Sequence, residues 1–188
     1  MTIISDRLKR KISQVFINEV SKNGFRHTSV AKIMKIADIR RQTFYDNFLD
    51  KYDLLYYVVS TNLKENIDDN IDYLNWEEII MLLFYDIELH AKFYRSVLKS
   101  QTEVDIVSMI ALHLTTLLFH ILEEKGLSNN QKAKDFVETY CLGMTYTMTA
   151  NLYHEPEIEY DELAKKVVNA IEFTFKNYGS LSNPVDKE

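Results

Sequence analysis

Glycine, proline and cysteine are scarce in this sequence of 188 residues, which holds only four, two and one of them. So few glycines and prolines leave little material for the tight turns that join β-strands. The lone Cys141 cannot form an internal disulfide and suits a reducing cytoplasm. Because the hydrophobic share of 46% is ample for a packed core, the composition predicts an all-α globular protein in the cytoplasm.

Signals for secretion and membrane insertion are also lacking. The N-terminus places its charges after a very short apolar patch, unlike a secretory signal peptide. No run approaches the roughly 20 uncharged apolar residues that a membrane span needs. We therefore expect neither a signal peptide nor a transmembrane helix.

The sequence shows no set of residues suited to catalysis or metal binding. His113 and His120 lie on one helix face and His90 could lie nearby, but a zinc site needs three or four converging ligands. Cys141 has no activating base beside it, and a glycine-rich phosphate loop is absent. We expect no catalytic residue, no metal and no cofactor.

Charge is distributed unevenly along the chain, whose net charge is −6. Residues 1–52 hold 11 Lys and Arg against 5 Asp and Glu, whereas residues 53–188 hold 11 against 23. DNA attracts a basic module and repels an acidic body, so this asymmetry favours a nucleic-acid-binding N-terminus.

The stretch from Gly24 to Leu54 predicts two short helices with a tight turn between them. Thr28 is expected to cap the first helix with its hydroxyl, and Asp38 tolerates the left-handed conformation that the turn requires. The second helix is expected over residues 40–47, with Phe44 and Phe48 facing inward. Its polar face then points to solvent, through Arg40, Arg41, Gln42, Thr43 and Tyr45. This is the helix–turn–helix arrangement whose second helix fits a DNA major groove.

A strong helix start follows at Asp50-Lys51-Tyr52-Asp53. Asp50 is placed as the N-cap, and Asp53 can reach back in a variant of the capping box. The free N–H groups of a helix N-terminus can hold a DNA phosphate, and Lys51 adds a full charge.

Many positions of this stretch together resemble the DNA-binding domain of the TetR family of bacterial transcription regulators. They are Gly24-Phe25, Thr28-Ser29-Val30, Ile33, Ala37, Thr43-Phe44-Tyr45, Phe48 and Lys51. Two residues depart from the family: Asp38, usually Gly, and Arg40, usually Ser or Thr, which removes the usual cap of the recognition helix. Residues 41–48 with 50–52 also resemble a subgroup linked to dihydroxyacetone kinase operons.

The resemblance implies a homodimer of about nine helices that binds a double-stranded DNA operator. Residues 1–50 would form the helix–turn–helix domain and residues 51–188 a helical regulatory and dimerisation domain. The predicted DNA contacts are Thr28, Arg40, Arg41, Gln42, Thr43, Tyr45, Asn47 and Lys51. Small residues on one helix and an apolar stripe on the last one predict the dimer contact, through Gly143, Thr147, Ala150, Val167, Ile171 and Phe175.

Helical periodicity predicts the remaining elements. They span residues 4–20, 51–69, 75 onward, 103–125, about 130–153 and 160–178. A break is expected near His90-Ala91 or Ser100-Gln101, and another at Glu155-Pro156. Gly24, Gly126 and Gly179 are placed at helix ends.

Three hypotheses for the body remain open. Its aromatic and methionine side chains could line a pocket for a small effector, as in a small-molecule-responsive repressor. Alternatively, the subgroup resemblance implies a co-regulator protein related to dihydroxyacetone kinase. The third possibility is an interaction adaptor whose helix–turn–helix no longer binds DNA. The polar side chains of residues 40–45 argue against it, because a helix with only a structural role would not require them.

Overall fold

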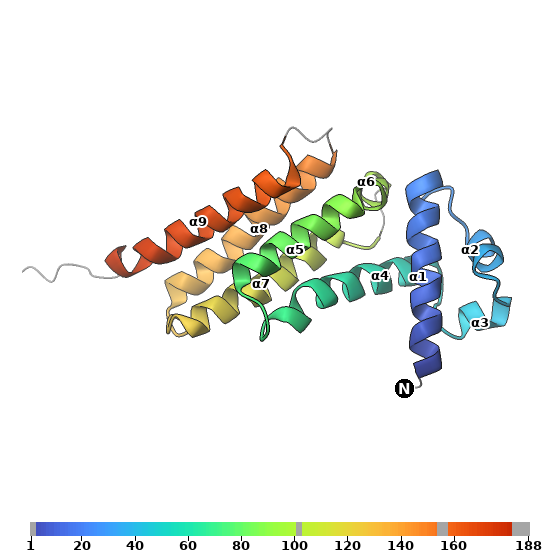
Figure 1. The fold of residues 1–188 in the computed structure, drawn as a ribbon, viewed down its shortest axis with the longest axis horizontal. Coiled ribbons are helices and arrows are strands. Elements are labelled where there is room, and N and C mark those ends of the chain that lie inside the picture. Colours follow the sequence, from blue (N-terminus) through green and yellow to red (C-terminus); the bar gives the residue numbers. More distant parts are fainter. Residues whose placement is uncertain (1–2, 101–102, 154–157, 182–188) are drawn as a thin grey trace, which may run out of the picture.

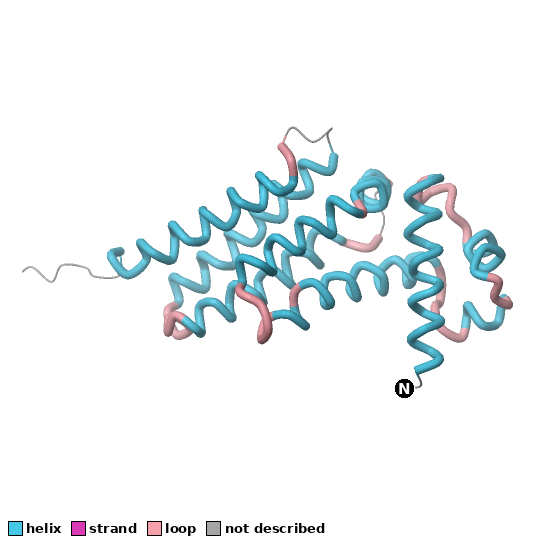
Figure 2. Tube along the Cα trace, viewed as in Figure 1, coloured by secondary structure: helices cyan, strands magenta, loops and turns pink. Residues whose placement is uncertain are grey.

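The computed structural model describes residues 3–100, 103–153 and 158–181, and these residues contain helices and no β-strand. The prediction of an all-α fold with nine α-helices is therefore confirmed (Figures 1 and 2). In chain order the elements, including the 3₁₀ helix η1, are α1 (Ile3–Asn23), α2 (Val30–Ala37), α3 (Arg41–Tyr45), α4 (Lys51–Asn66), η1 (Asp68–Asn70), α5 (Trp76–Leu89), α6 (Ala91–Lys99), α7 (Ile106–Glu124), α8 (Gln131–Tyr153) and α9 (Tyr160–Leu181).

The molecule is elongated, with a small head at one end of a helical body. Figure 1 shows α1 lying crosswise to the body, with α2 and α3 on its outer side. Helix α4 runs from the head into the body, where it packs on α5 and α7. There α7 lies against α8, and α5 lies against α9. The division at residue 50 stays a prediction, although α4 begins at Lys51.

One hydrophobic core runs through head and body. In the head, α1 buries Ile12, Phe16 and Val20 at helical spacing. The ring of Phe16 lies 6.2 Å from that of Phe25 in the head and 5.9 Å from that of Phe93 in α6. Each of these pairs is edge-to-face, the geometry that aromatic rings prefer. Head and body are therefore packed together rather than joined by α4 alone.

Local signals set most helix ends as the sequence predicts. Gly24 has φ +86° and Gly126 has φ +69°, the left-handed conformation of a helix C-terminus. The N–H of Asn75 donates to the Glu78 carboxylate at 3.1 Å, as in a capping box at the start of α5. Both breaks proposed as alternatives occur, because α6 is a separate short helix between residues 90 and 100. The predicted break at Glu155-Pro156 lies outside the described residues.

Several predicted boundaries are wrong, and in the body α7 begins at Ile106 rather than at residue 103. Helix α4 ends at Asn66 rather than near residue 69, and η1 follows it. Helix α9 continues through Gly179 to Leu181, so this glycine does not end it.

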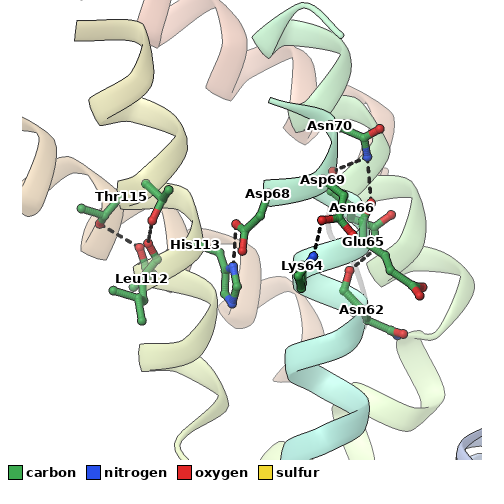
Figure 3. Close-up of polar contacts among 12 residues, drawn as sticks. Asn62, Lys64, Glu65, Asn66, Asp68, Asp69, Asn70, Leu112, His113 and Thr115 are labelled. Carbon is green, nitrogen blue, oxygen red and sulfur yellow. Dashed lines mark hydrogen bonds and ion pairs between the residues drawn. The ribbon is translucent and has the colours of Figure 1, made fainter. Parts of the chain in front are cut away.

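A polar contact ties the far end of α4 to α7. His113 Nδ1 of α7 lies 2.8 Å from Asp68 Oδ1 at the start of η1 (Figure 3). The Asn70 amide closes the end of α4 by donating to the Glu65 carbonyl at 2.7 Å. The Asn70 amide satisfies a carbonyl group that a helix C-terminus leaves unpaired, and the contact of His113 with Asp68 joins this end of α4 to the body.

Helix α7 corrects the expectation that no apolar run is long enough to cross a membrane. An 18-residue stretch of this 19-residue helix has a mean hydropathy of 1.7, and by length and composition alone the helix could span one. Its buried side chains recur from Ile106 through Leu114 to Leu122 and lie in the protein core. The packing of α7 against α4 and α8 gives this apolar surface a role within the fold.

The predicted dimer residues fall into two groups. Val167, Ile171 and Phe175 are 7%, 0% and 9% exposed within the single chain. Within the single chain they bury the inner face of α9 in the core, although Val167 also lines the groove beside Gly143, and their place in a dimer contact stays a prediction. Gly143 and Thr147 of α8 are exposed and Ala150 is half-buried, so these three remain accessible to a partner.

We predict that Ile171→Ala lowers the free energy of unfolding by about 2–5 kcal/mol, because it removes a fully buried side chain and leaves a cavity. Urea unfolding measures this. Asn169→Ala, at an exposed position of the same helix, is the matched control and should stay within about 0.5 kcal/mol. Loss of self-association without loss of stability would place Ile171 in the interface instead.

Candidate nucleic-acid interface

The start of α2 is capped by Ser29 rather than Thr28. The Ser29 hydroxyl accepts from the Lys32 N–H at 3.3 Å, at an extended backbone position that suits an N-cap. Thr28 is 1% exposed and donates its hydroxyl to the Gly24 carbonyl at 2.9 Å. The predictions of Thr28 as cap and as DNA contact are therefore corrected, because its side chain is buried in the loop that positions α2.

The turn between α2 and α3 has the geometry that the sequence predicts. Asp38 has φ 51° and ψ 56°, the only positive φ at a non-glycine residue in the described chain. The Ile39 N–H donates to the Met34 carbonyl at 3.1 Å and closes the turn. Arg40 precedes α3 in an extended conformation and gives no side-chain cap. Helix α3 is consequently only five residues long, shorter than the predicted 40–47.

Aromatic packing holds this short helix. Phe44 and Phe48 are 0% and 3% exposed, which confirms their inward orientation. Phe48 lies 5.3 Å from the Tyr57 ring of α4, centroid to centroid. The Lys9 ammonium of α1 lies 5.7 Å and 5.2 Å from the centroids of these two rings, within cation–π range. Helix α3 is thus fixed against both α1 and α4.

The outer face of α3 is polar and exposed. Arg40, Arg41, Gln42 and Tyr45 are exposed, as predicted. The Arg41 guanidinium carbon lies 5.5 Å from the centroid of the Tyr45 ring, a contact that orients the side chain outward. Arg and Gln are the residues that pair bidentately with guanine and adenine edges in a major groove.

Two further predicted contacts are only partly accessible. Thr43 and Asn47 are half-buried, and the Asn47 amide donates to the Thr43 carbonyl at 2.8 Å. This bond satisfies a carbonyl at the end of α3. Asn47 therefore has a structural role whether or not it meets DNA.

Lys51 has a bonding role within the head. Its ammonium donates to the carbonyls of Phe25 at 3.2 Å and Thr28 at 3.4 Å. It also lies 4.5 Å from the centroid of the Phe25 ring. Partial burial lowers the pKa of Lys51. The lysine thus fixes the loop before α2, and two of its three donors are used there.

The start of α4 beside Lys51 is capped as predicted. Asp50 accepts from the N–H groups of Tyr52 at 2.7 Å and Asp53 at 2.9 Å. Asp53 reaches back to the Leu49 N–H at 2.9 Å, one residue before the N-cap. The carboxylates of Asp50 and Asp53 therefore lie at the positive N-terminal end of the α4 dipole, where we expected a DNA phosphate to bind.

The structure reveals a contact between head and body that the sequence does not signal. The Phe25 N–H donates to Ser96 Oγ of α6 at 2.8 Å, and Arg26 donates to the Ser100 carbonyl at 3.4 Å. Helix α4 is the continuous element that runs from the head into the body. Since α6 also holds the loop before α2, there are two routes.

The residues considered for metal binding or catalysis do not form a site of that kind in the part of the chain that the structure describes. Among the described residues, no group of three or more His, Cys, Asp and Glu could hold a metal ion. Cys141 is fully buried, and burial raises the pKa of its thiol to about 11. A thiol with such a pKa is a poor nucleophile at neutral pH.

Comparison with known proteins agrees with this geometry. A structure of the dihydroxyacetone kinase operon activator DhaS superposes with a TM-score of 0.80, at 20% identity over 93% of this chain and 98% of that one. The chain has a TetR-like fold. A protein assigned to the TetR family, from Syntrophomonas wolfei, superposes with a TM-score of 0.66, at 16% identity over 96% and 99% of the two chains.

The sequence itself resembles DhaS. It is 27% identical over 125 residues to the HTH-type dhaKLM operon transcriptional activator DhaS of Lactococcus lactis subsp. lactis (strain IL1403). The match covers 66% of this chain and 63% of that relative, so the chain spans less than two thirds of the relative's length. No protein family model matches the sequence.

We predict that Lys51→Ala weakens binding to all DNA sequences alike and makes the salt dependence shallower by about one unit. Loss of its bonds to two carbonyls should also lower the free energy of unfolding by about 1 kcal/mol. Fluorescence anisotropy across a salt series and urea unfolding measure the two effects. An unchanged salt slope with lowered stability would leave Lys51 a role in the fold alone.

Proposed function

We propose that this protein is a sequence-specific DNA-binding transcription regulator, and that it activates a dihydroxyacetone kinase operon. The observation that carries the proposal is the exposed polar face of α3, held rigidly by two buried phenylalanines on a basic head. An interaction adaptor would have no need of this face. The likeness to DhaS supports both the activity and the operon, and a regulator of this kind works in the cytoplasm.

The experiment for this function is selection of DNA fragments by the purified full-length protein, followed by the same selection with Arg41→Ala and Gln42→Ala. The wild type should enrich one near-palindromic sequence. Each variant should lose about 1–3 kcal/mol of discrimination at one base position, because a bidentate contact is lost. Gln14→Ala, on the exposed side of α1, is the control and should retain the preference. Enrichment of no sequence by the wild type would overturn the proposal.

We further propose that the protein acts as a homodimer through α8 and α9. Gly143 and Thr147 line an open groove of about 570 Å³ between these helices, together with Phe136, Tyr140, Met144, Ile158 and Ala170. Small residues let a helix of a second copy approach closely, and two helices per subunit form a four-helix bundle across a two-fold axis. The two copies of α3 would then lie about 34–36 Å apart, or a multiple of this, on the operator.

Gly143 gives a sharp test of this interface. A β-carbon added there would meet no atom within 4 Å in the same chain. Gly143→Trp should therefore leave the fold intact while it blocks association, so we expect a monomer by sedimentation velocity with an unchanged helical circular dichroism spectrum. Gly143→Ala is the matched control and should remain dimeric. A dimeric Gly143→Trp variant would remove this face from the interface.

We propose that the signal comes from a protein co-regulator related to dihydroxyacetone kinase rather than from a free metabolite. Both hollows of about 570 Å³ in the body are open grooves along α9, which suit a protein surface better than they enclose a three-carbon sugar. The alternative is a small-molecule-responsive repressor with an effector pocket in the body.

Isothermal titration of the purified protein with dihydroxyacetone separates these two signals. We expect no heat of binding and no change in operator affinity without a second protein, because the sugar is sensed by the partner. A kinase-like protein titrated in the same cell should bind. Tight sugar binding together with a changed operator affinity would restore the effector-pocket hypothesis.

A further inference from the structure

A groove between α5 and the start of α9 combines an apolar floor with an acidic rim. It has a volume of about 570 Å³. Its floor includes Leu74, Met81, Leu82, Phe84, Tyr85 and Ala164. All the charged residues that line it are acidic: Glu77, Glu78, Glu88 and Asp161. This groove is separate from α3 and from the groove between α8 and α9.

The apolar part of this groove is left uncovered by the chain. Tyr85 is 62% exposed and Leu74 is 38% exposed. Exposed apolar surface rimmed by polar groups is typical of an interaction site. Among the described residues, Glu77 and Glu88 form no ion pair, although Glu77 also lines a neighbouring hollow that contains Lys125 and Lys176. Asp161 pairs with Lys165 on its own helix and contributes less.

We propose that this groove binds a basic amphipathic helix of a partner protein. The apolar face of such a helix would cover Met81 and Tyr85, while its Lys or Arg side chains would meet Glu77 and Glu88. These two acids lie eleven positions apart on α5, which is about 16 Å along the helix axis. A partner helix of three to four turns can therefore contact both.

Charge distinguishes this partner from a second copy of the same body. Residues 53–188 hold 23 Asp and Glu against 11 Lys and Arg, so one acidic body repels another at an acidic rim. The groove between α8 and α9 has no acidic lining residue and contains Lys166. The two grooves on either side of α9 are thus suited to different occupants.

The groove lies next to the contact that holds the head. Glu88 lies at the end of α5, three residues before α6 begins at Ala91, and α5 packs on α6. Arg95 donates to the Leu152 carbonyl of α8 at 2.9 Å, and the adjacent Ser96 accepts from the Phe25 N–H at 2.8 Å. A helix bound near Glu88 is therefore placed to bias α6 and, through Ser96, the loop before α2.

This docking site deepens the proposed function, because it specifies where a protein co-regulator would act. It makes no use of α3. Selection for operator DNA and selection for groove ligands can therefore fail separately.

The test uses a display library of helical peptides of about 18 residues, selected on the full-length wild-type protein. We expect the enriched peptides to be amphipathic and rich in Lys and Arg. Their affinity should fall about tenfold or more on Glu88→Lys and on Tyr85→Ala. Matched controls are Glu123→Lys, at an exposed acid of α7, and Tyr56→Ala, at an exposed tyrosine of α4; both should bind as the wild type does.

Three results would overturn the docking site. The first is enrichment of no peptide, or of peptides without basic residues. The second is equal binding to the groove variants and the control variants. The third is conversion of the protein to a monomer by Glu88→Lys or Tyr85→Ala in sedimentation, which would make the groove a contact between two copies. A failed operator selection alongside a successful peptide selection would count against DNA binding alone.

Discussion

The packing of two phenylalanines beneath α3 is the constraint on which the rest of the head depends. A helix of five residues has no stability of its own, since isolated helices shorter than about 12–15 residues are marginal in water. Phe44 and Phe48 give it a fixed position, because both rings are buried, Phe44 lies against Phe48, and Phe48 lies against Tyr57 of α4. The polar face lies on the other side of α3 from Phe44, where Arg41, Gln42 and Tyr45 are exposed.

Three separate contacts fix this head relative to the body. Helix α4 runs directly from one to the other, and Asp68 anchors its far end to His113 of α7. The ring of Phe16 packs on Phe93, and the backbone of Phe25 bonds to Ser96. Lys51 of α4 and Ser96 of α6 both bond to the loop before α2, so two helices connect the body to the head. A regulator that responds to a signal needs such mechanical continuity.

Helix α9 separates two grooves of equal volume and different chemistry. Toward α8, small residues such as Gly143 and Thr147 allow close approach of a similar surface. Toward α5, the groove is lined by the acidic residues Glu77, Glu78, Glu88 and Asp161, which suit the basic partner that we propose. One helix whose inner face belongs to the core can therefore support self-association on one side and a different partner on the other.

The sequence by itself determined the features that depend on neighbouring residues in the chain. The all-α class, the left-handed Asp38, the Asp50 cap and the inward pair Phe44 and Phe48 follow from composition, from turn and cap chemistry and from helical periodicity. These interactions join residues only a few positions apart, so the local sequence pattern is enough to predict them. The same local rules placed the cap at Thr28, which was wrong, because the packing of the loop buries Thr28 and Ser29 caps α2 instead.

The tertiary structure alone decided which surface covers each apolar stripe. Periodicity shows that Val167, Ile171 and Phe175 share a face of α9, but a second copy and the chain's own core are equivalent partners at that level. Likewise, the apolar length of α7 fits a membrane span as well as a core helix. Lys51 bonds to carbonyls that lie more than twenty positions away in the chain. Contacts between residues so far apart in the chain do not appear in the periodicity of the sequence. For the apolar stripes the reason is that hydrophobic burial is non-directional and does not specify its partner.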